Sequence, residues 1–195
     1  MTIRRASALI AACVIALFAA LTTPAHAADL PSESLYRLPI ALVDRSGRGF
    51  LLAQRAGKPQ LVSMFYTSCQ YVCPLIIDTL KKTQAQLTPA ERARLAILLV
   101  SFDPVRDTPE RLQQVFAERK LDAATWTLAR TDERDVRKLA AALDIQYRVL
   151  ANGEVSHSSA LVLLDAQGRI AAHTDHIGEV DADFIIAVKK ALAPR

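Results

Sequence analysis

Two nearly continuous apolar runs, at residues 61–67 and 94–102, stand out in the middle of the chain. Runs of this length without polar alternation are typical of strands buried on both faces of a sheet. A helical pattern follows each run, from Pro74 to about residue 87 and from Thr108 onward. Thr108 suits a helix N-cap, and the proline after it suits the first helical position. The pattern therefore predicts two strand–helix units in succession.

The rest of the chain continues the alternation and then changes it. The predicted elements are a short hairpin at 41–44 and 49–52, a strand at 124–129, a helix at 132–143, hairpins at 147–155 and 160–173, and a final helix at 181–192. This order predicts an α/β fold with a mixed central sheet flanked by helices and an N-terminal hairpin extension. A strand, a cysteine pair and a helix start, in that order, are the thioredoxin arrangement.

The N-terminus has the pattern of an export signal. Arg4 and Arg5 precede an apolar run at 8–21, and Ala25-His26-Ala27 supplies a small-x-small cleavage site. We expect residues 1–27 to be a signal peptide and residues 28–195 to form one thioredoxin-like domain, exported to the periplasm or facing it from the inner membrane. The alternative is a retained anchor, because the run is only somewhat shorter than the ~20 residues of a membrane span.

Cys13 offers a second alternative for the N-terminus. Ile10-Ala11-Ala12-Cys13 resembles a lipoprotein cleavage box, which would give a lipid anchor. However, the apolar run continues for eight residues after Cys13, whereas a lipidated cysteine should open the polar mature chain. A membrane is therefore expected only through a partner or through an uncleaved or lipidated N-terminus.

Charge excludes some classes of partner. The formal net charge is +4, and removing Arg4 and Arg5 with the signal leaves +2. An excess of this size indicates neither a nucleic-acid surface nor a strongly acidic partner. The mature chain keeps two cysteines, Cys69 and Cys73. In an oxidising compartment such a pair forms a disulfide, a redox couple or part of a metal site.

The spacing of Cys69 and Cys73 favours chemistry over a purely structural bridge. Residues i and i+4 lie on one side of a helix, and a helix N-terminus favours a thiolate. A disulfide that closes so short a loop stabilises little, so a structural bridge is the weaker reading. Two thiolates are half of a metal site, and an imidazole would complete one suited to Cu(I).

Three histidines remain after export. His157 precedes the strand predicted at 160–164, in a loop that this fold brings back beside the cysteines, so it is the leading third ligand. The plain alternative for His157 is a solvated loop side chain. We expect His173 and His176 to be surface residues, since they lie at a strand end and in the following loop.

The mature chain resembles the Sco/SenC family of exported thioredoxin-fold copper proteins from end to end. The matching segments are Leu42-Val43-Asp44, Gly57-Lys58, Met64 to Pro74 with its C-x-x-x-C-P pattern, Ser101 to Pro109, Ser156-His157-Ser158 and Leu163-Leu164-Asp165. The cysteine pattern alone is moderately specific. Its combination with D-P-x-R-D-T-P and a histidine in the right place is strong.

The resemblance implies one copper ion per chain, held by Cys69, Cys73 and His157, with Asp103 beside the site. It implies a metallochaperone rather than an enzyme, whose partner is the copper subunit of cytochrome c oxidase or another periplasmic copper protein. Arg106, Asp107 and Thr108 are expected to secure their loop and cap the next helix. One departure matters, because Gln70-Tyr71 stands where the family commonly has Pro-Asp.

Two alternative functions use the same thiols. A thiol–disulfide oxidoreductase that reduces the cysteines of a partner copper protein needs only Cys69 and Cys73, although their spacer is one residue longer than in C-x-x-C reductants. A peroxidase of the peroxiredoxin type is disfavoured, because Thr67 lies one residue closer to Cys69 than the T-x-x-C arrangement requires.

Overall fold

The computed structural model describes residues 30–151 and 155–193. The predicted signal peptide, Cys13 and the turn predicted at Asn152-Gly153 lie outside these residues. In the two described ranges, every helix is too short or too polar to cross a bilayer.

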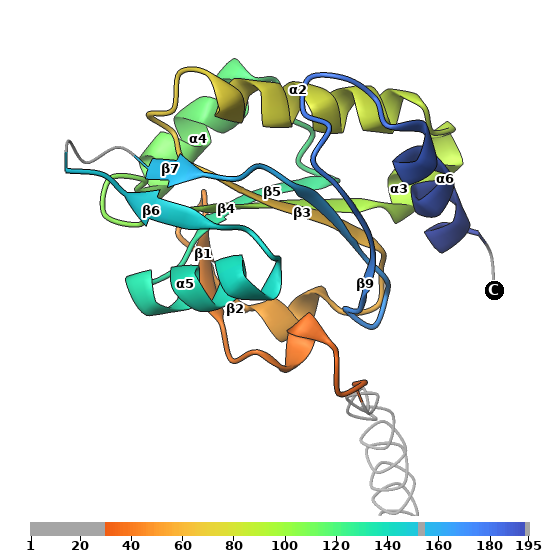
Figure 1. Cartoon of the computed structure of the whole chain (residues 1–195), viewed down its shortest axis with the longest axis horizontal. Coiled ribbons are helices and arrows are strands. Elements are labelled where there is room, and N and C mark those ends of the chain that lie inside the picture. The colour runs from red at the N-terminus through yellow and green to blue at the C-terminus, as the bar shows by residue number, and fades with distance from the viewer. Residues whose placement is uncertain (1–29, 152–154, 194–195) are drawn as a thin grey trace, which may run out of the picture. The chain divides into compact units, whose positions relative to one another are not determined.

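A seven-stranded mixed sheet forms the centre of the domain, with strand order β2-β1-β5-β4-β3-β8-β9 (Figure 1). Its strands are β1 (Ala41–Asp44), β2 (Gly49–Leu51), β3 (Gln60–Phe65), β4 (Ala96–Ser101), β5 (Trp126–Arg130), β8 (Leu161–Leu164) and β9 (Ile170–Thr174). Strands β3, β4 and β5 run parallel, and the outer pairings are antiparallel. The predicted mixed sheet is confirmed.

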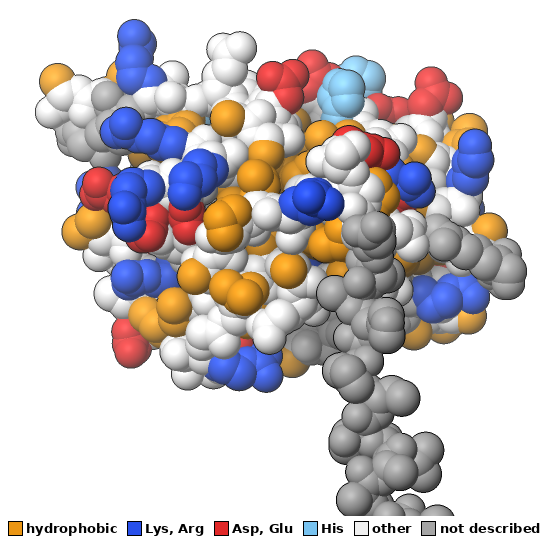
Figure 2. Space-filling model, turned by 90° about the horizontal axis from the view of Figure 1, so that it is seen from below, with side chains coloured by type: hydrophobic (Ala, Val, Ile, Leu, Met, Phe, Trp, Pro, Cys, Tyr) orange, Lys and Arg blue, Asp and Glu red, His pale blue; other side chains and the backbone are white. Residues whose placement is uncertain are grey.

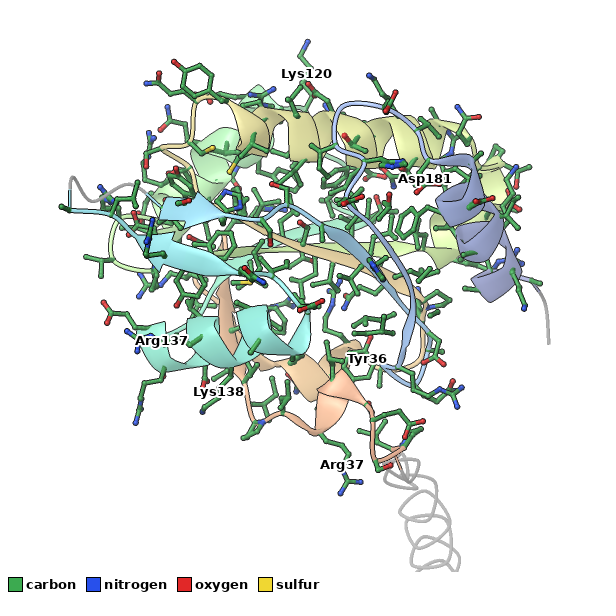
Figure 3. The ribbon with its side chains drawn as sticks, viewed as in Figure 1. Tyr36, Arg37, Lys120, Arg137, Lys138 and Asp181 are labelled. Atoms are coloured by element: carbon green, nitrogen blue, oxygen red, sulfur yellow. The ribbon has the colours of Figure 1, made fainter. Side chains whose placement is uncertain are left out.

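The core lies at β3, β4 and β8. Every residue of β3 and β8 is buried, and in β4 only the first residue is partly exposed. Helices cover both faces, with α2 on one side of the sheet and α5 on the other (Figure 1). The helices are α2 (Val72–Ala85), α3 (Pro89–Arg94), α4 (Pro109–Glu118), α5 (Glu133–Ala142) and α6 (Ala182–Ala191). On α5, Arg137 and Lys138 point away from the sheet (Figure 3).

The N-terminal hairpin is part of the main sheet rather than an appendage to it. Strand β1 pairs with β2 and also, antiparallel, with β5, where Val43 faces Arg130. Two 3₁₀ helices flank the hairpin, η1 (Leu35–Arg37) and η2 (Leu52–Arg55). Gly47 takes a positive φ of 79° in the β1–β2 turn, which suits a residue without a side chain.

The helices between β3 and β4 differ from the sequence prediction in two ways. Helix α2 begins at Val72 rather than Pro74, because a proline is tolerated anywhere in a first turn whose N–H groups lack helical partners. The chain then forms the additional helix α3, which the hydrophobic pattern does not predict. Its signal was present in Thr88 and Glu91, whose side chains and backbone form a reciprocal capping box.

The predicted loop around His157 is wrong in one respect. His157 is the last residue of a short strand, β7 (Val155–His157), which pairs antiparallel with β6 (Tyr147–Val149) in a separate two-stranded sheet. Tyr147 lies opposite His157 in this pairing. The hydrogen bonds between β6 and β7 therefore fix the backbone of His157, whereas a loop would leave it free to change conformation.

Candidate metal centre

The cysteines occupy the connection from β3 to α2. The Cys69 N–H donates to the Tyr66 carbonyl at 3.3 Å, which turns the chain sharply after the strand. Cys73 lies in the first turn of α2, and its N–H donates to the Sγ of Cys69 at 3.3 Å. The N-terminus of α2 therefore directs a backbone donor at one of the two sulfurs, which favours a thiolate there.

The two thiols differ in acidity. Partial burial raises the pKa of Cys69, but hydrogen bonds from the Cys73 thiol and from backbone N–H groups outweigh it and lower this pKa overall. Burial raises the pKa of the Cys73 thiol far above its ordinary value, and its hydrogen bond to Cys69 acts in the same direction. Cys69 is therefore the more acidic of the two thiols and the one that ionises first.

The ring of His157 is held in one orientation. It packs against Phe102 with ring centroids 4.8 Å apart and edge-on against Tyr66 at 6.0 Å. Its Nδ1 lies 2.9 Å from the Ser158 carbonyl oxygen. Because a carbonyl can only accept, Nδ1 carries the proton, and Nε2 keeps its lone pair. Nε2 is buried and has no hydrogen-bond partner within residues 30–151 and 155–193.

These three side chains come together as a possible metal site. Ligand atoms of Cys69, Cys73 and His157 all lie within 4.8 Å of one another. In the part of the chain that the structure describes, no other group of three such side chains does so. An unpartnered buried imidazole nitrogen beside two sulfurs fits a soft metal ion, since Cu(I) favours thiolate and accepts imidazole.

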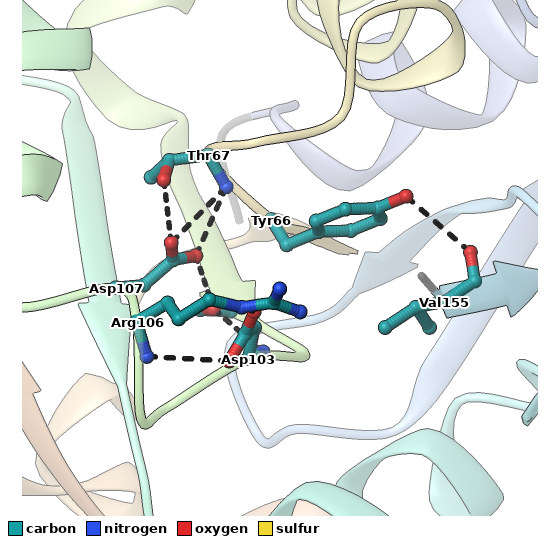
Figure 4. A network of polar contacts seen from close by, with 7 residues as sticks. Tyr66, Thr67, Asp103, Arg106, Asp107 and Val155 are labelled. Carbon is teal, nitrogen blue, oxygen red and sulfur yellow. Dashed lines mark hydrogen bonds and ion pairs between the residues drawn. The ribbon is translucent and has the colours of Figure 1, made fainter. Parts of the chain in front are cut away.

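Asp107 supports the cysteine loop from beneath. Its buried carboxylate accepts the Thr67 N–H at 3.0 Å, the Thr67 hydroxyl and the Ser101 hydroxyl (Figure 4). Thr67 lies two residues before Cys69, so these bonds fix the point at which the loop leaves β3. Thr108 caps α4, as expected for this segment. The sequence predicted that Asp107 secures a loop, and the structure shows that its contact is with the start of the cysteine loop.

Asp103 stands apart from the three ligand atoms. Its carboxylate forms an ion pair with Arg106 and closes its own loop (Figure 4). Together with Phe102, Tyr147 and Val155 it lines a pocket of about 200 Å³. Because Phe102 also touches the His157 ring, Asp103 is connected to the site through packing rather than through the ligands.

The other candidate positions point to solvent. His173 and His176 are exposed, as predicted. His176 Nδ1 lies 3.6 Å from the Asp181 carboxylate. Figure 2 shows histidine beside acidic side chains at the surface. Gln70 and Tyr71 are exposed as well, Tyr71 to 83%. The departure at these two positions therefore alters the surface around the cysteines rather than the packing beneath them.

Comparison with known proteins agrees with this geometry. The family model SCO1/SenC matches residues 29–193. The chain belongs to the SCO1/SenC family. Its domain has the thioredoxin-like fold of the solved Sco structures, so the predicted family and fold are confirmed.

Individual relatives are distant but cover most of the chain. A Stutzerimonas stutzeri protein named for copper binding is 26% identical over 182 residues, which are 88% of this chain and 87% of that protein. The copper-bound structure of yeast Sco1 has a TM-score of 0.65 at 20% identity, covering 80% of this chain and 89% of that one. BsSco, described as a member of the Sco family of cytochrome c oxidase assembly proteins, has a TM-score of 0.68 at 22% identity and covers 80% and 93%.

Proposed function

We propose that this protein binds one copper ion as cargo through Cys69 Sγ, Cys73 Sγ and His157 Nε2. The observation that carries the proposal is the convergence of two sulfurs and an imidazole nitrogen within 4.8 Å, together with a buried and unpartnered Nε2 on His157. Two sulfurs and one nitrogen suit Cu(I), which accepts low coordination numbers and soft ligands. Relatives named for copper binding or solved with copper support the choice of metal.

The unequal burial of the ligands suits transfer rather than permanent storage. Cys73 is buried, whereas Cys69 is partly exposed and lies beside the solvent-facing Gln70 and Tyr71. An incoming thiolate from a partner would reach the metal from the side of Cys69. Cys73 must lose its proton when metal binds, so binding releases a proton and weakens as the pH falls.

The proposed recipient is the copper subunit of cytochrome c oxidase or another periplasmic copper protein. The description of BsSco as a member of a family of oxidase assembly proteins supports this role. The export pattern at residues 1–27 supports a location in the periplasm or facing it. Under this proposal the protein is a binding protein that acts on a partner, not an enzyme.

The test is copper stoichiometry and affinity of the reduced protein, measured by competition with a Cu(I) chelator. We expect one copper per chain. His157→Ala and Cys73→Ser should weaken binding by more than about 100-fold, since loss of a residue that only hydrogen-bonds to a metal ligand already costs about 10–100-fold. His173→Ala is the matched control and should bind as the parent does. Equal affinity of His157→Ala and His173→Ala would refute the three-ligand site.

The asymmetry of the thiols favours a second candidate function, thiol–disulfide exchange with a partner copper protein. Cys69 is accessible and acidic and would attack, and buried Cys73 would resolve the mixed disulfide. The test is the rate at which the reduced protein reduces a small aromatic disulfide. A rate no faster than that of a free thiol would remove this candidate without affecting the copper proposal.

A further inference from the structure

A second concave site lies at the end of the sheet away from the cysteines. The pocket has a volume of about 350 Å³ and is lined by Arg48, Gly49, Phe50, Gln54, Arg55 and Thr127. Arg55 contacts Gln60, the first residue of β3, whereas the cysteine loop follows the last residue of that strand. The pocket and the candidate metal centre are therefore distinct sites.

The Arg55 side chain is held rigidly by neutral groups. Its Nε donates to Gln60 Oε1 at 2.7 Å, and its Nη1 donates to Thr127 Oγ1 at 3.1 Å. Across residues 30–151 and 155–193, no carboxylate lies within 4.0 Å of its nitrogen atoms, whereas Arg48, Arg106 and Arg169 each have one. A partly buried guanidinium without a counter-ion is costly, because its charge is only partly solvated.

The surroundings of Arg55 contain more hydrogen-bond donors than acceptors. A guanidinium has five N–H groups, and Gln60 and Thr127 accept from two of them. The Nε2 of Gln60 is fully buried, and no acceptor for it exists in the described structure. The Tyr36 hydroxyl, which points inward from η1 (Figure 3), is also buried without a partner. Gln60 and Tyr36 do not line the pocket, so the three remaining N–H groups of Arg55 are the ones that an acceptor with several oxygen atoms would meet there.

Arg48 adds a second positive charge at the rim. Its side chain is 80% exposed and makes an ion pair of 3.3 Å with Asp44. Asp44 is buried and also accepts hydrogen bonds from the Ser46 hydroxyl and from the N–H groups of Ser46 and Arg48, so it stays hydrogen-bonded when the Arg48 side chain turns toward an anion. The lining contains no acidic residue. Figure 2 shows basic side chains among apolar ones on the lower face of the domain.

We propose that this pocket binds a phosphate group, with Arg55 as its principal ligand and Arg48 closing over it. The fixed fork of a guanidinium donates two parallel hydrogen bonds to one phosphate, and Thr127 and Gln60 hold that fork in place. The phosphate supplies the negative charge that Arg55 lacks among its neighbours in the described structure. The phosphate is either a soluble one or the headgroup of an anionic lipid.

The first experiment titrates the purified full-length protein with inorganic phosphate at constant ionic strength set by chloride, and follows the thermal midpoint and Arg55 Nε by NMR. We expect a saturable rise in the midpoint and a shift of the Arg55 resonance. Arg55→Lys, which keeps the charge but loses the fork, should weaken binding at least about 10-fold, as loss of a charge-assisted hydrogen bond does. Arg134→Gln, an exposed arginine outside the pocket, is the control.

Thr127→Val is a second variant, which keeps Arg55 but removes the acceptor of its Nη1. We expect Thr127→Val to weaken phosphate binding and to leave copper binding unchanged. Flotation with phosphatidylglycerol vesicles then separates the sources. Vesicle binding that requires Arg55 identifies a lipid headgroup, and phosphate binding without vesicle binding identifies a soluble phosphate. A response equal to that in chloride, or one unchanged in Arg55→Lys and Thr127→Val, would overturn the proposal.

Discussion

The backbone N–H of Cys73 donates to the Sγ of Cys69 at 3.3 Å, so the start of α2 stabilises negative charge on one cysteine and not on the other. Burial of Cys73 strengthens the contrast, since only the thiol of Cys69 has a lowered pKa. The two sulfurs are therefore chemically unequal before any metal binds.

This inequality predicts selective alkylation. In the reduced, metal-free protein, iodoacetamide should modify Cys69 first. This preference should persist below about pH 8.5, which is the ordinary pKa of a free cysteine. Cys73 should react only after unfolding. Peptide mass spectrometry over a pH series measures both rates. Equal rates at the two cysteines in the folded protein would contradict the assignment.

Asp107 is predicted to matter more for copper binding than Asp103. Asp107→Asn leaves hydroxyl and N–H donors of Thr67 and Ser101 poorly matched, which should cost about 1–3 kcal/mol of unfolding free energy. The loosened loop should also lower copper affinity about 10–100-fold. Chemical denaturation and chelator competition measure the two effects. Asp103→Asn is the control. A larger loss of copper affinity in Asp103→Asn than in Asp107→Asn would contradict the prediction.

The packing of Phe102 on His157 predicts a coupling between core and metal site. Phe102→Ala should destabilise the fold by about 3–5 kcal/mol, as is usual for a buried phenylalanine. It should also weaken copper binding, because the His157 imidazole loses the ring that packs against it and holds its orientation. Phe116→Ala is the matched control, since Phe116 is buried in α4 against Arg45. It should lose stability while keeping copper affinity, and equal effects on copper would refute the coupling.

Asp165 makes stability depend on pH in the acid range. Burial raises the pKa of its carboxyl, but the side chain and N–H of Arg169 and the N–H of Gln167 outweigh it and lower this pKa overall. The folded pKa is therefore below the unfolded one. The stabilisation is complete above the unfolded pKa of about 3.9 and is lost as the pH falls through the folded pKa.

Asp165→Asn should accordingly lower stability at neutral pH and show a smaller further loss between about pH 5 and pH 2 than the parent protein. Urea unfolding across this range measures the slope. An unchanged slope in Asp165→Asn would show that the carboxylate contributes nothing.

Two glycines with similar backbone angles should respond differently to substitution. Gly168 and Gly47 have φ values of 83° and 79°. A Cβ at Gly168 would collide with the Tyr36 ring and the Ser34 hydroxyl, whereas one at Gly47 would meet nothing within 4 Å. Gly47→Ala should cost about 1–2 kcal/mol from backbone strain alone. Gly168→Ala should cost clearly more, and thermal unfolding of the pair measures the difference.

The sequence by itself determined the local features of this protein. The buried strands, the capped start of α4 and the placement of Cys69 and Cys73 at a helix start all follow from residues close together in the chain. Hydrophobic periodicity, caps and turns act over a few residues, so the order of elements and the α/β class could be predicted.

Tertiary structure alone decided how distant residues meet. The choice of Asp107 rather than Asp103 beneath the cysteine loop and the packing of Phe102 on the His157 ring depend on residues far apart in the chain. Thr67 and Asp107 are 40 residues apart. Strand register and side-chain packing set such contacts, and no local pattern encodes them, because each partner's environment exists only after the sheet has formed.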